Sequence, residues 1–312
     1  MRSTPINLLE MGKNRIFIKR EDLIPVSFGG NKARKAYNFF KEIDEGSFDY
    51  VVTYGSSSSN HCRIIANMSA SRNLPCLIIS PEEESEKTFN SLLMELFGAE
   101  IKVVPVEAVS KTIDTALEDL RKQGRKPYFI AGGGHGNCGT QAYVDCFNEI
   151  LSYERENALC FDYIFHASGT GTTQAGLVCG KLINKSGAKI VGISIARQRP
   201  RGRQVVIDSV AEYLSDGGYN FTQNEIDEAV IFEDLYICGG YAKKSEDVDK
   251  VINKMMCQYG IPVDSTYVGK AYWGMLQYLE KENIQNKNIL FIHTGGTPLF
   301  FDDLNRICNK DE

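Results

Sequence analysis

Short apolar segments alternate with longer segments of helical period along most of this 312-residue chain. The apolar segments have the length and composition of buried strands, at residues 50–53, 76–79, 101–104, 128–131, 163–166, 190–195 and 289–292. Apolar residues recur at helical spacing in residues 60–72, 84–97, 109–122, 172–184 and 247–259. This alternation predicts an α/β fold in which mostly parallel sheets are covered by helices.

Length and composition describe an ordinary globular protein. A chain of this length forms one large or two modest domains, and 43 % hydrophobic with 24 % charged residues argues against long disordered regions. The formal net charge of -5 disfavours a nucleic-acid surface. One basic cluster is interpreted as a solvated loop or a subunit contact rather than a polyanion site, and it consists of Arg197, Arg199, Arg201 and Arg203.

The nine cysteines are dispersed and include no Cys-x-x-Cys pair, so the sequence predicts neither a disulfide framework nor a metal site. No apolar run approaches the roughly 20 residues of a membrane span, and the N-terminal residues lack the apolar core of a signal peptide. We therefore expect a cytoplasmic protein with no membrane partner.

The segments that follow several predicted strands are unusually rich in glycine and in small hydroxyl residues. They are residues 54–61, 132–137, 168–174 and 293–298. In open α/β sheets, ligands bind beyond the carboxyl ends of the strands, where such loops converge. One such loop is explained by a tight turn, but four together indicate a ligand site.

Two of these loops lead into predicted helices and can bind anions. Free N–H groups and hydroxyls at a helix start suit the dianionic phosphate of a cofactor, here at Gly169, Thr170, Gly171, Thr172 and Thr173. A dinucleotide site competes, because Gly-x-Gly also opens a Rossmann fingerprint. The acidic residue expected about 20 positions later is missing, although Arg197 could meet an NADP 2′-phosphate. A P-loop is excluded, because no Gly-Lys-Ser or Gly-Lys-Thr follows.

The second anion-binding loop suits a carboxylate and contains Ser57, Ser59, Asn60 and His61. Plain N-capping by Ser59 or Asn60 is the structural alternative. A hydrolase triad is disfavoured, because no Gly-x-Ser-x-Gly elbow is present.

Lys32 enters a helix directly after a Gly-Gly-Asn turn. The turn fixes the direction of its amine, which could form an imine with an aldehyde cofactor. Taken alone, a lysine is usually a solvated surface group. The phosphate and carboxylate loops favour the cofactor interpretation.

The motifs together resemble the fold type II pyridoxal-phosphate enzymes. They are Lys-Arg-Glu-Asp-Leu at 19–23, Gly-Gly-Asn-Lys-x-Arg-Lys at 29–35, Ser-Asn-His-x-Arg at 59–63, Gly-Thr-Gly-Thr-Thr-Gln-Ala-Gly-Leu at 169–177 and His-Thr-Gly-Gly-Thr-Pro at 293–298. The chain is most similar to the D-cysteine desulfhydrase and 1-aminocyclopropane-1-carboxylate deaminase family, from about Pro5 to about Phe301.

The resemblance implies two open, twisted, mostly parallel sheets of the tryptophan synthase β type, with pyridoxal 5′-phosphate in the cleft between domains. Residues 1–45 and 155–312 would form the larger, cofactor-anchoring domain, and residues 46–154 the smaller, substrate-side domain. A homodimer is the oligomer that the family implies.

The resemblance also implies roles for individual residues. Lys32 would be the Schiff-base lysine, Lys35 and residues 169–173 would hold the phosphate, and Asn60 would face the pyridine 3′-oxygen. Ser59 would lie beside the substrate carboxylate, with Ser57 and His61 near it. Tyr241 and Tyr267 would be the two active-site tyrosines, although single tyrosines are more often half-buried packing residues.

Three positions depart from the nearest relatives. The deaminase branch has glutamate and leucine where this chain has Val268 and Thr294, so opening of a cyclopropane ring is disfavoured. At the position of Thr294, which would meet the pyridine nitrogen, the desulfhydrase branch similarly has threonine. His135 replaces a usual serine and could read a second acidic group on the substrate.

We therefore expect a lyase that releases pyruvate, ammonia and a leaving group from D-cysteine or a β-substituted relative. Cysteate desulfonation, dehydration, β- or γ-replacement and cyclopropane deamination stay open. From other classes, an NADP-binding oxidoreductase and a non-catalytic amino-acid-binding protein stay open. The enantiomer used and the choice between elimination and replacement are not predicted.

Overall fold

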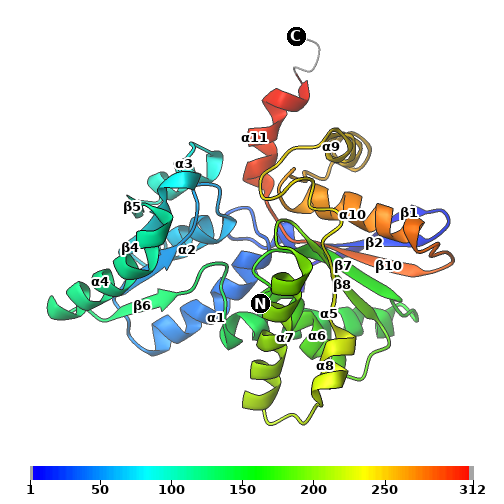
Figure 1. The fold of residues 1–312 in the computed structure, drawn as a ribbon, viewed down its shortest axis with the longest axis horizontal. Coiled ribbons are helices and arrows are strands. Elements are labelled where there is room, and N and C mark those ends of the chain that lie inside the picture. The colour runs from blue at the N-terminus through cyan, green and yellow to red at the C-terminus, as the bar shows by residue number, and fades with distance from the viewer. Residues whose placement is uncertain (1–2, 309–312) are drawn as a thin grey trace.

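The computed structural model describes residues 3–308, apart from the side chain of Asn305. Two sheets organise the described chain (Figure 1). The six-stranded sheet has the order β1 (Ile6–Met11), β2 (Arg15–Arg20), β10 (Asn288–His293), β7 (Tyr163–Ser168), β8 (Lys189–Ser194) and β9 (Ile231–Glu233). The four-stranded sheet has the order β5 (Glu100–Val104), β4 (Cys76–Pro81), β3 (Tyr50–Tyr54) and β6 (Pro127–Ile130).

All described strand pairs are parallel except β1 with β2, which forms an antiparallel edge. The predicted fold class, with two mostly parallel sheets covered by helices, is confirmed. The helices are α1 (Asn31–Glu45), α2 (Asn60–Ala70), α3 (Phe89–Leu96), α4 (Val109–Lys122), α5 (Asn137–Glu156), α6 (Thr172–Ile183), α7 (Arg199–Asp216), α8 (Gln223–Ala229), α9 (Glu246–Tyr259), α10 (Val268–Lys281) and α11 (Thr297–Cys308).

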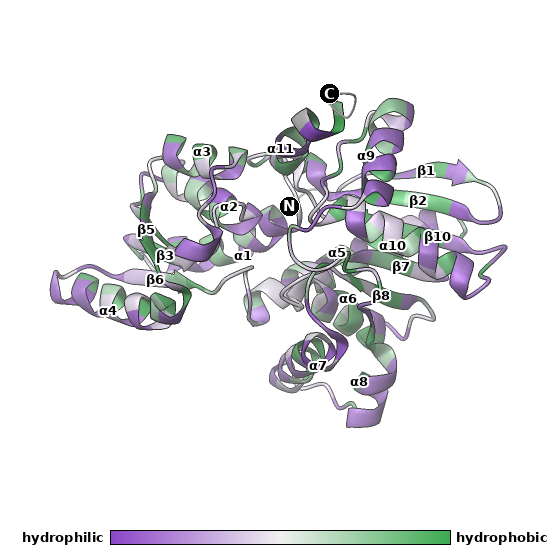
Figure 2. Ribbon diagram, turned by 45° about the horizontal axis from the view of Figure 1, so that its top comes forward, coloured by the Kyte–Doolittle hydropathy of each residue, from purple (hydrophilic) through white to green (hydrophobic). Residues whose placement is uncertain are grey.

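The larger sheet is buried on both faces, because successive side chains of its strands point to opposite sides. Leu290 packs in one apolar cluster with residues of α5, α6 and α7, while Phe291 packs in another with residues of α9 and α10. In the smaller sheet, Val51 packs with α1 and α2, and Val52 packs with α4. Figure 2 shows hydrophobic ribbon concentrated in the strands and hydrophilic ribbon on the outer helices.

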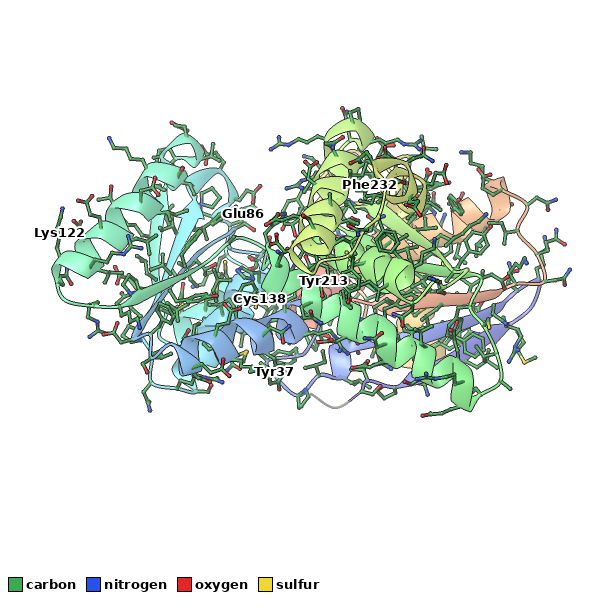
Figure 3. The ribbon with its side chains drawn as sticks, turned by 90° about the horizontal axis from the view of Figure 1, so that it is seen from below. Tyr37, Glu86, Lys122, Cys138, Tyr213 and Phe232 are labelled. Carbon is green, nitrogen blue, oxygen red and sulfur yellow. The ribbon has the colours of Figure 1, made fainter. Side chains whose placement is uncertain are left out.

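Helices α1 and α5 join the two sheets. The apolar side of α1 contributes Phe39 and Phe40 to the core of the smaller sheet, whereas α5 contributes Tyr143 to the core of the larger one. The two helices pack together, and Figure 3 shows Tyr37 of α1 and Cys138 of α5 where they meet. The division at residues 45/46 and 154/155 stays a prediction.

A buried network of ion pairs also connects α1 and α5. Arg34 of α1 pairs with Glu21 at 2.5 Å and with Glu149 of α5 at 2.8 Å. Lys19 completes the network with a 2.7 Å bond to Glu149. Arg34 and Glu21 are almost wholly shielded from solvent, so the network fixes the helix that carries Lys32.

Each predicted strand is present, with bounds shifted by at most two residues. The helix predicted over residues 84–97 is wrong at its start, because α3 begins at Phe89. Thr88 caps it by accepting from the Ser91 N–H, and Glu84 lies in a separate short turn. No helix among residues 3–308 is long and apolar enough to cross a membrane.

Candidate active site

A cavity of about 370 Å³ opens at the carboxyl ends of strands from both sheets. The loops after β3, β6, β7, β8 and β10 all contribute to its lining, as the glycine and hydroxyl segments predict. The predicted site residues that line the cavity are Lys32, Ser59, Asn60, His61, Gly169, Thr170, Tyr241, Tyr267 and Thr294.

Glycine at position 30 lets the lysine helix start against the last strand of the larger sheet. Gly30 has φ 102°, and a Cβ on it would lie 2.7 Å from the carbonyl oxygen of Thr294. The Asn31 N–H donates to that same carbonyl at 2.9 Å. Only glycine tolerates both the backbone angle and the close approach. Lys32 is therefore held at the end of β10, beside Thr294.

Lys32 and Lys35 donate to one acceptor. The Nζ of Lys32 lies 3.1 Å and the Nζ of Lys35 lies 3.2 Å from the carbonyl oxygen of Gly133, in the loop after β6. Neither lysine has a carboxylate partner among the described residues. Burial lowers the pKa of Lys32 to about 8, and burial together with the charge of Lys32 lowers the pKa of Lys35 well below its usual value. The cavity thus holds an amine that is readily deprotonated near neutral pH.

The start of α2 offers a hydroxyl donor to the cavity. The Ser59 side chain accepts from the Cys62 N–H at 3.2 Å, so the predicted capping role is real. The bond uses the oxygen only as an acceptor, and the O–H can still donate to an anion. Ser59 therefore both caps the helix and fits the carboxylate site.

The amide of Asn60 is oriented by two neighbours. Its oxygen accepts from Arg63 at 3.2 Å and from Asn90 at 3.0 Å. Because the oxygen is occupied on that side, the NH₂ group is the part left for the cavity. A donor at this place fits an anionic ring oxygen such as the 3′-oxygen of pyridoxal phosphate. Arg63 is fully buried, and burial lowers its pKa to about 9.

His61 is neutral. Its Nε2 lies 2.9 Å from the Thr53 hydroxyl, and burial with the charges of Lys32 and Lys35 lowers its pKa well below the usual value. The ring therefore shapes the cavity without adding charge.

The start of α6 fits a phosphate group. Gly171 caps the helix with φ 95°, and the first N–H groups of a helix have no acceptor within it. The hydroxyl of Thr172 is buried without a partner among the described residues, and Thr173 accepts from Asn31 at 3.0 Å. Orphaned donors at a helix start are suited to an anion.

Two tyrosines form a chain of hydroxyls across the cavity. The hydroxyl oxygens of Tyr241 and Tyr267 lie 2.7 Å apart, and Ser58 lies 3.2 Å from Tyr241. Ser56 lies 3.2 Å from Ser58 and also lines the cavity. Burial and the neighbouring Tyr241 raise the pKa of Tyr267 well above its usual value. Tyr267 therefore stays protonated and can donate.

Several predicted residues lie outside the lining of this cavity. Ser57 faces another cavity, between β4 and α3, and its carbonyl accepts from Thr88 at 2.8 Å. His135 is half-buried and lies 3.4 Å from Ser209. A further four are not among the lining residues and are Lys35, Gly171, Thr172 and Thr173. Val268 is fully buried in the core of the larger sheet.

Other residues that the sequence motifs do not predict also line the cavity, among them Tyr54, Ser56 and Glu84. The run of hydroxyl residues 56–59 is the signal that could have found Ser56 and Ser58. Asn90 and Glu84 belong to a separate segment with no motif, so nothing in the sequence pointed to their contacts.

The fold and the cavity define a class of protein, the fold type II enzymes that use pyridoxal phosphate. The family model described as "Pyridoxal-phosphate dependent enzyme" matches residues 2–295, and this chain belongs to that family. Pyridoxal phosphate is therefore its cofactor, as the sequence predicts.

Individual relatives with known names are similar to this chain over most of its length. The chain is 30 % identical to a putative 1-aminocyclopropane-1-carboxylate deaminase of Pyrococcus abyssi, over 96 % of this chain and 90 % of the relative. It is also 30 % identical to the D-cysteine desulfhydrase of Yersinia enterocolitica, over 92 % and 88 %. A solved structure of an ACC deaminase homologue superimposes with TM-score 0.87 and 31 % identity, over 99 % of this chain and 94 % of that one. The predicted family is confirmed.

Proposed function

We propose that this protein is a lyase that eliminates a β-substituent from a small amino acid, with D-cysteine or a β-substituted relative as substrate. The observation that carries the proposal is the convergence of Lys32, the Tyr241–Tyr267 pair and the start of α2 on one cavity. When bound, the cofactor supplies an electron sink for the bonds at the α-carbon of the amino acid.

Lys32 would bind the cofactor covalently and afterwards move the proton of the α-carbon. Its amine suits a general base at neutral pH, because burial lowers its pKa to about 8. Lys35 and the start of α6 would hold the phosphate. The NH₂ group of Asn60 would donate to the ring oxygen.

Ser59 would donate to the substrate carboxylate, with the first N–H groups of α2 beside it. The hydroxyls of Tyr241 and Tyr267 would donate to the leaving group or return a proton to it. Thiolate is a leaving group that such hydroxyls can protonate.

The residues around the ring favour elimination over opening of a cyclopropane ring. Val268 is buried in the core and offers no carboxylate, whereas Thr294 lines the cavity and offers a hydroxyl. Glu84 is the one acidic side chain in the lining that the structure describes, and it comes from the loop before α3. A neutral partner at the pyridine nitrogen is compatible with elimination. The resemblance to relatives called D-cysteine desulfhydrase supports the same reaction.

The oligomer and the compartment belong to the same proposal. A homodimer is the state that the resemblance supports, and light scattering of the purified protein tests it. A cytoplasmic location is supported by the absence of disulfide patterning among the nine cysteines.

Incubation with D- and L-amino acids tests the proposed reaction, with sulfide, pyruvate and ammonia measured together. The proposal expects the three products from D-cysteine in equal amounts. Pyruvate from cysteine without sulfide, or turnover of 1-aminocyclopropane-1-carboxylate alone, would contradict it.

A further inference from the structure

The cavity holds a cation that the proposed reaction does not use. Arg197 follows β8 and lines the cavity, with its side chain half-buried. Its guanidinium donates one weak bond, from Nη1 to the carbonyl oxygen of Thr170 at 3.4 Å. It has no carboxylate partner among the described residues. Most of its donors are therefore available to a ligand.

The other arginines of the same run have different surroundings. Arg203 bonds to the carbonyl oxygen of Val230 at 3.3 Å and forms a 3.9 Å ion pair with Asp227. Arg201 is exposed and lies outside the cavity. Arg197 alone among the arginines of this run lines the cavity, and Arg199, Arg201 and Arg203 lie in α7, so the interpretation of the run as a solvated loop is wrong.

The anions required by the proposed reaction already have binding groups. In the proposed function, the start of α6 and Lys35 would hold the cofactor phosphate, and the start of α2 with Ser59 would hold the substrate carboxylate. Burial and the charge of Arg201 lower the pKa of Arg197, and no carboxylate among the described residues gives its charge compensation through an ion pair. Glu84 is not that compensation, because no ion pair joins the two.

We propose that Arg197 binds a second anionic group on the substrate, so that the preferred substrate is an amino acid whose side chain ends in a sulfonate or phosphate. This inference rests on the proposed function and names the substrate class of the same site. A guanidinium suits such groups because its paired N–H donors match their oxygens.

Elimination from such a substrate balances without any further reactant than water. With a sulfonate on the β-carbon, Lys32 takes the α-proton and the carbon–sulfur bond breaks, with its electron pair leaving on sulfur as sulfite. Addition of one water to the remaining fragment gives pyruvate and ammonia. No oxidant or reductant is consumed.

Kinetics with the holoenzyme test this assignment, with cysteate and O-phosphoserine as acidic substrates and cysteine and β-chloroalanine as neutral ones. For each compound both enantiomers are used. We expect Arg197→Gln to lower kcat/KM for acidic relative to neutral substrates by about 10- to 100-fold, mainly through KM. Arg197→Lys should restore part of the ratio, and the exposed Arg201→Gln should leave it unchanged. A ratio that Arg197→Gln does not alter would overturn the assignment, as would a parallel loss of cofactor affinity that accounts for the whole effect.

A binding measurement separates this inference from the proposed function. Aspartate has no β-leaving group, so calorimetry of its binding to the holoenzyme reads recognition alone. We expect aspartate to bind more tightly than alanine, and Arg197→Gln to abolish that difference. Equal binding of the two by the wild type would overturn the inference even if cysteine is a substrate. Absence of product from every amino acid, with tight aspartate binding retained, would instead overturn the proposed reaction and support the Arg197 site.

Discussion

The amine of Lys32 donates to the carbonyl oxygen of Gly133 across 3.1 Å, and this bond joins the start of α1 to the loop after β6 of the smaller sheet. The carbonyl is shared with Lys35. Because the amine of Lys32 is buried and no described carboxylate pairs with it, burial favours loss of its proton.

The pH dependence of cofactor uptake follows from this environment. Only the neutral amine attacks an aldehyde, and burial lowers the pKa of Lys32 from 10.5 to about 8. The uptake rate of apoprotein should therefore rise with pH up to about 8 and then level off, when followed by stopped-flow absorbance. A rate that keeps rising towards pH 10, as for a solvated lysine, would show that the amine is not buried in this way.

The hydroxyl pair of Tyr241 and Tyr267 should contribute to turnover rather than to cofactor binding. Tyr241→Phe removes the contacts with both Tyr267 and Ser58, and kcat should fall by about 10²- to 10⁴-fold if the pair moves a proton. The absorption spectrum of the bound cofactor should be retained. Tyr236→Phe is the matched control, since the Tyr236 hydroxyl is buried with no partner in the described chain. Equal losses in the two variants would argue against the role of the pair.

The buried network under α1 should dominate local stability. Arg34→Met leaves Glu21 buried without its main partner, and the free energy of unfolding should fall by about 3–5 kcal/mol. The exposed pair of Arg72 with Asp44 gives the comparison, because Arg72→Met should cost only about 0–1 kcal/mol. Chemical denaturation measures both. A loss of similar size in the two variants would mean that the network has little net strength.

Gly30 tests the close approach of α1 to β10. Gly30→Ala strains the positive φ and also places a Cβ 2.7 Å from the Thr294 carbonyl, so both stability and cofactor affinity should fall. Gly98 has φ +74° but nothing within 4 Å of an added Cβ. Gly98→Ala should therefore show only the backbone cost of about 1 kcal/mol and keep cofactor affinity. Matching losses of affinity at the two positions would contradict the proposed geometry.

Strands with strong apolar runs and helices with clear caps could be predicted from the sequence. Residues 109–122 have the predicted bounds, because an apolar side recurs along a solvated helix. Strand β2 has charged residues at both ends and only a short apolar centre. Strand β9 has only three residues. Neither strand therefore has a strong local signal. Their burial comes from pairing with β10 and β8, which no local pattern reports.

In the candidate site, too, contacts between residues distant in the sequence could not be predicted. The positions of Lys32, Asn60 and Tyr267 in one cavity could be predicted because motifs surround them, and their roles stay predictions. Asn90 orients Asn60 from a segment 30 residues away, and only the tertiary fold brings them together. The motif around Ser57 predicts that its side chain lies in the substrate site. In the structure Ser57 lies in the turn before α2 and lines another cavity.

Covalent capture of the cofactor tests the central claim most directly. Purified protein is incubated with pyridoxal phosphate, reduced with borohydride, digested and analysed by mass spectrometry. The account predicts the reduced cofactor on Lys32, its loss with the visible absorption band in Lys32→Ala, and its retention in Lys41→Ala, which changes an exposed lysine of the same helix. Modification of a different lysine, or an unchanged absorption band in Lys32→Ala, would contradict it.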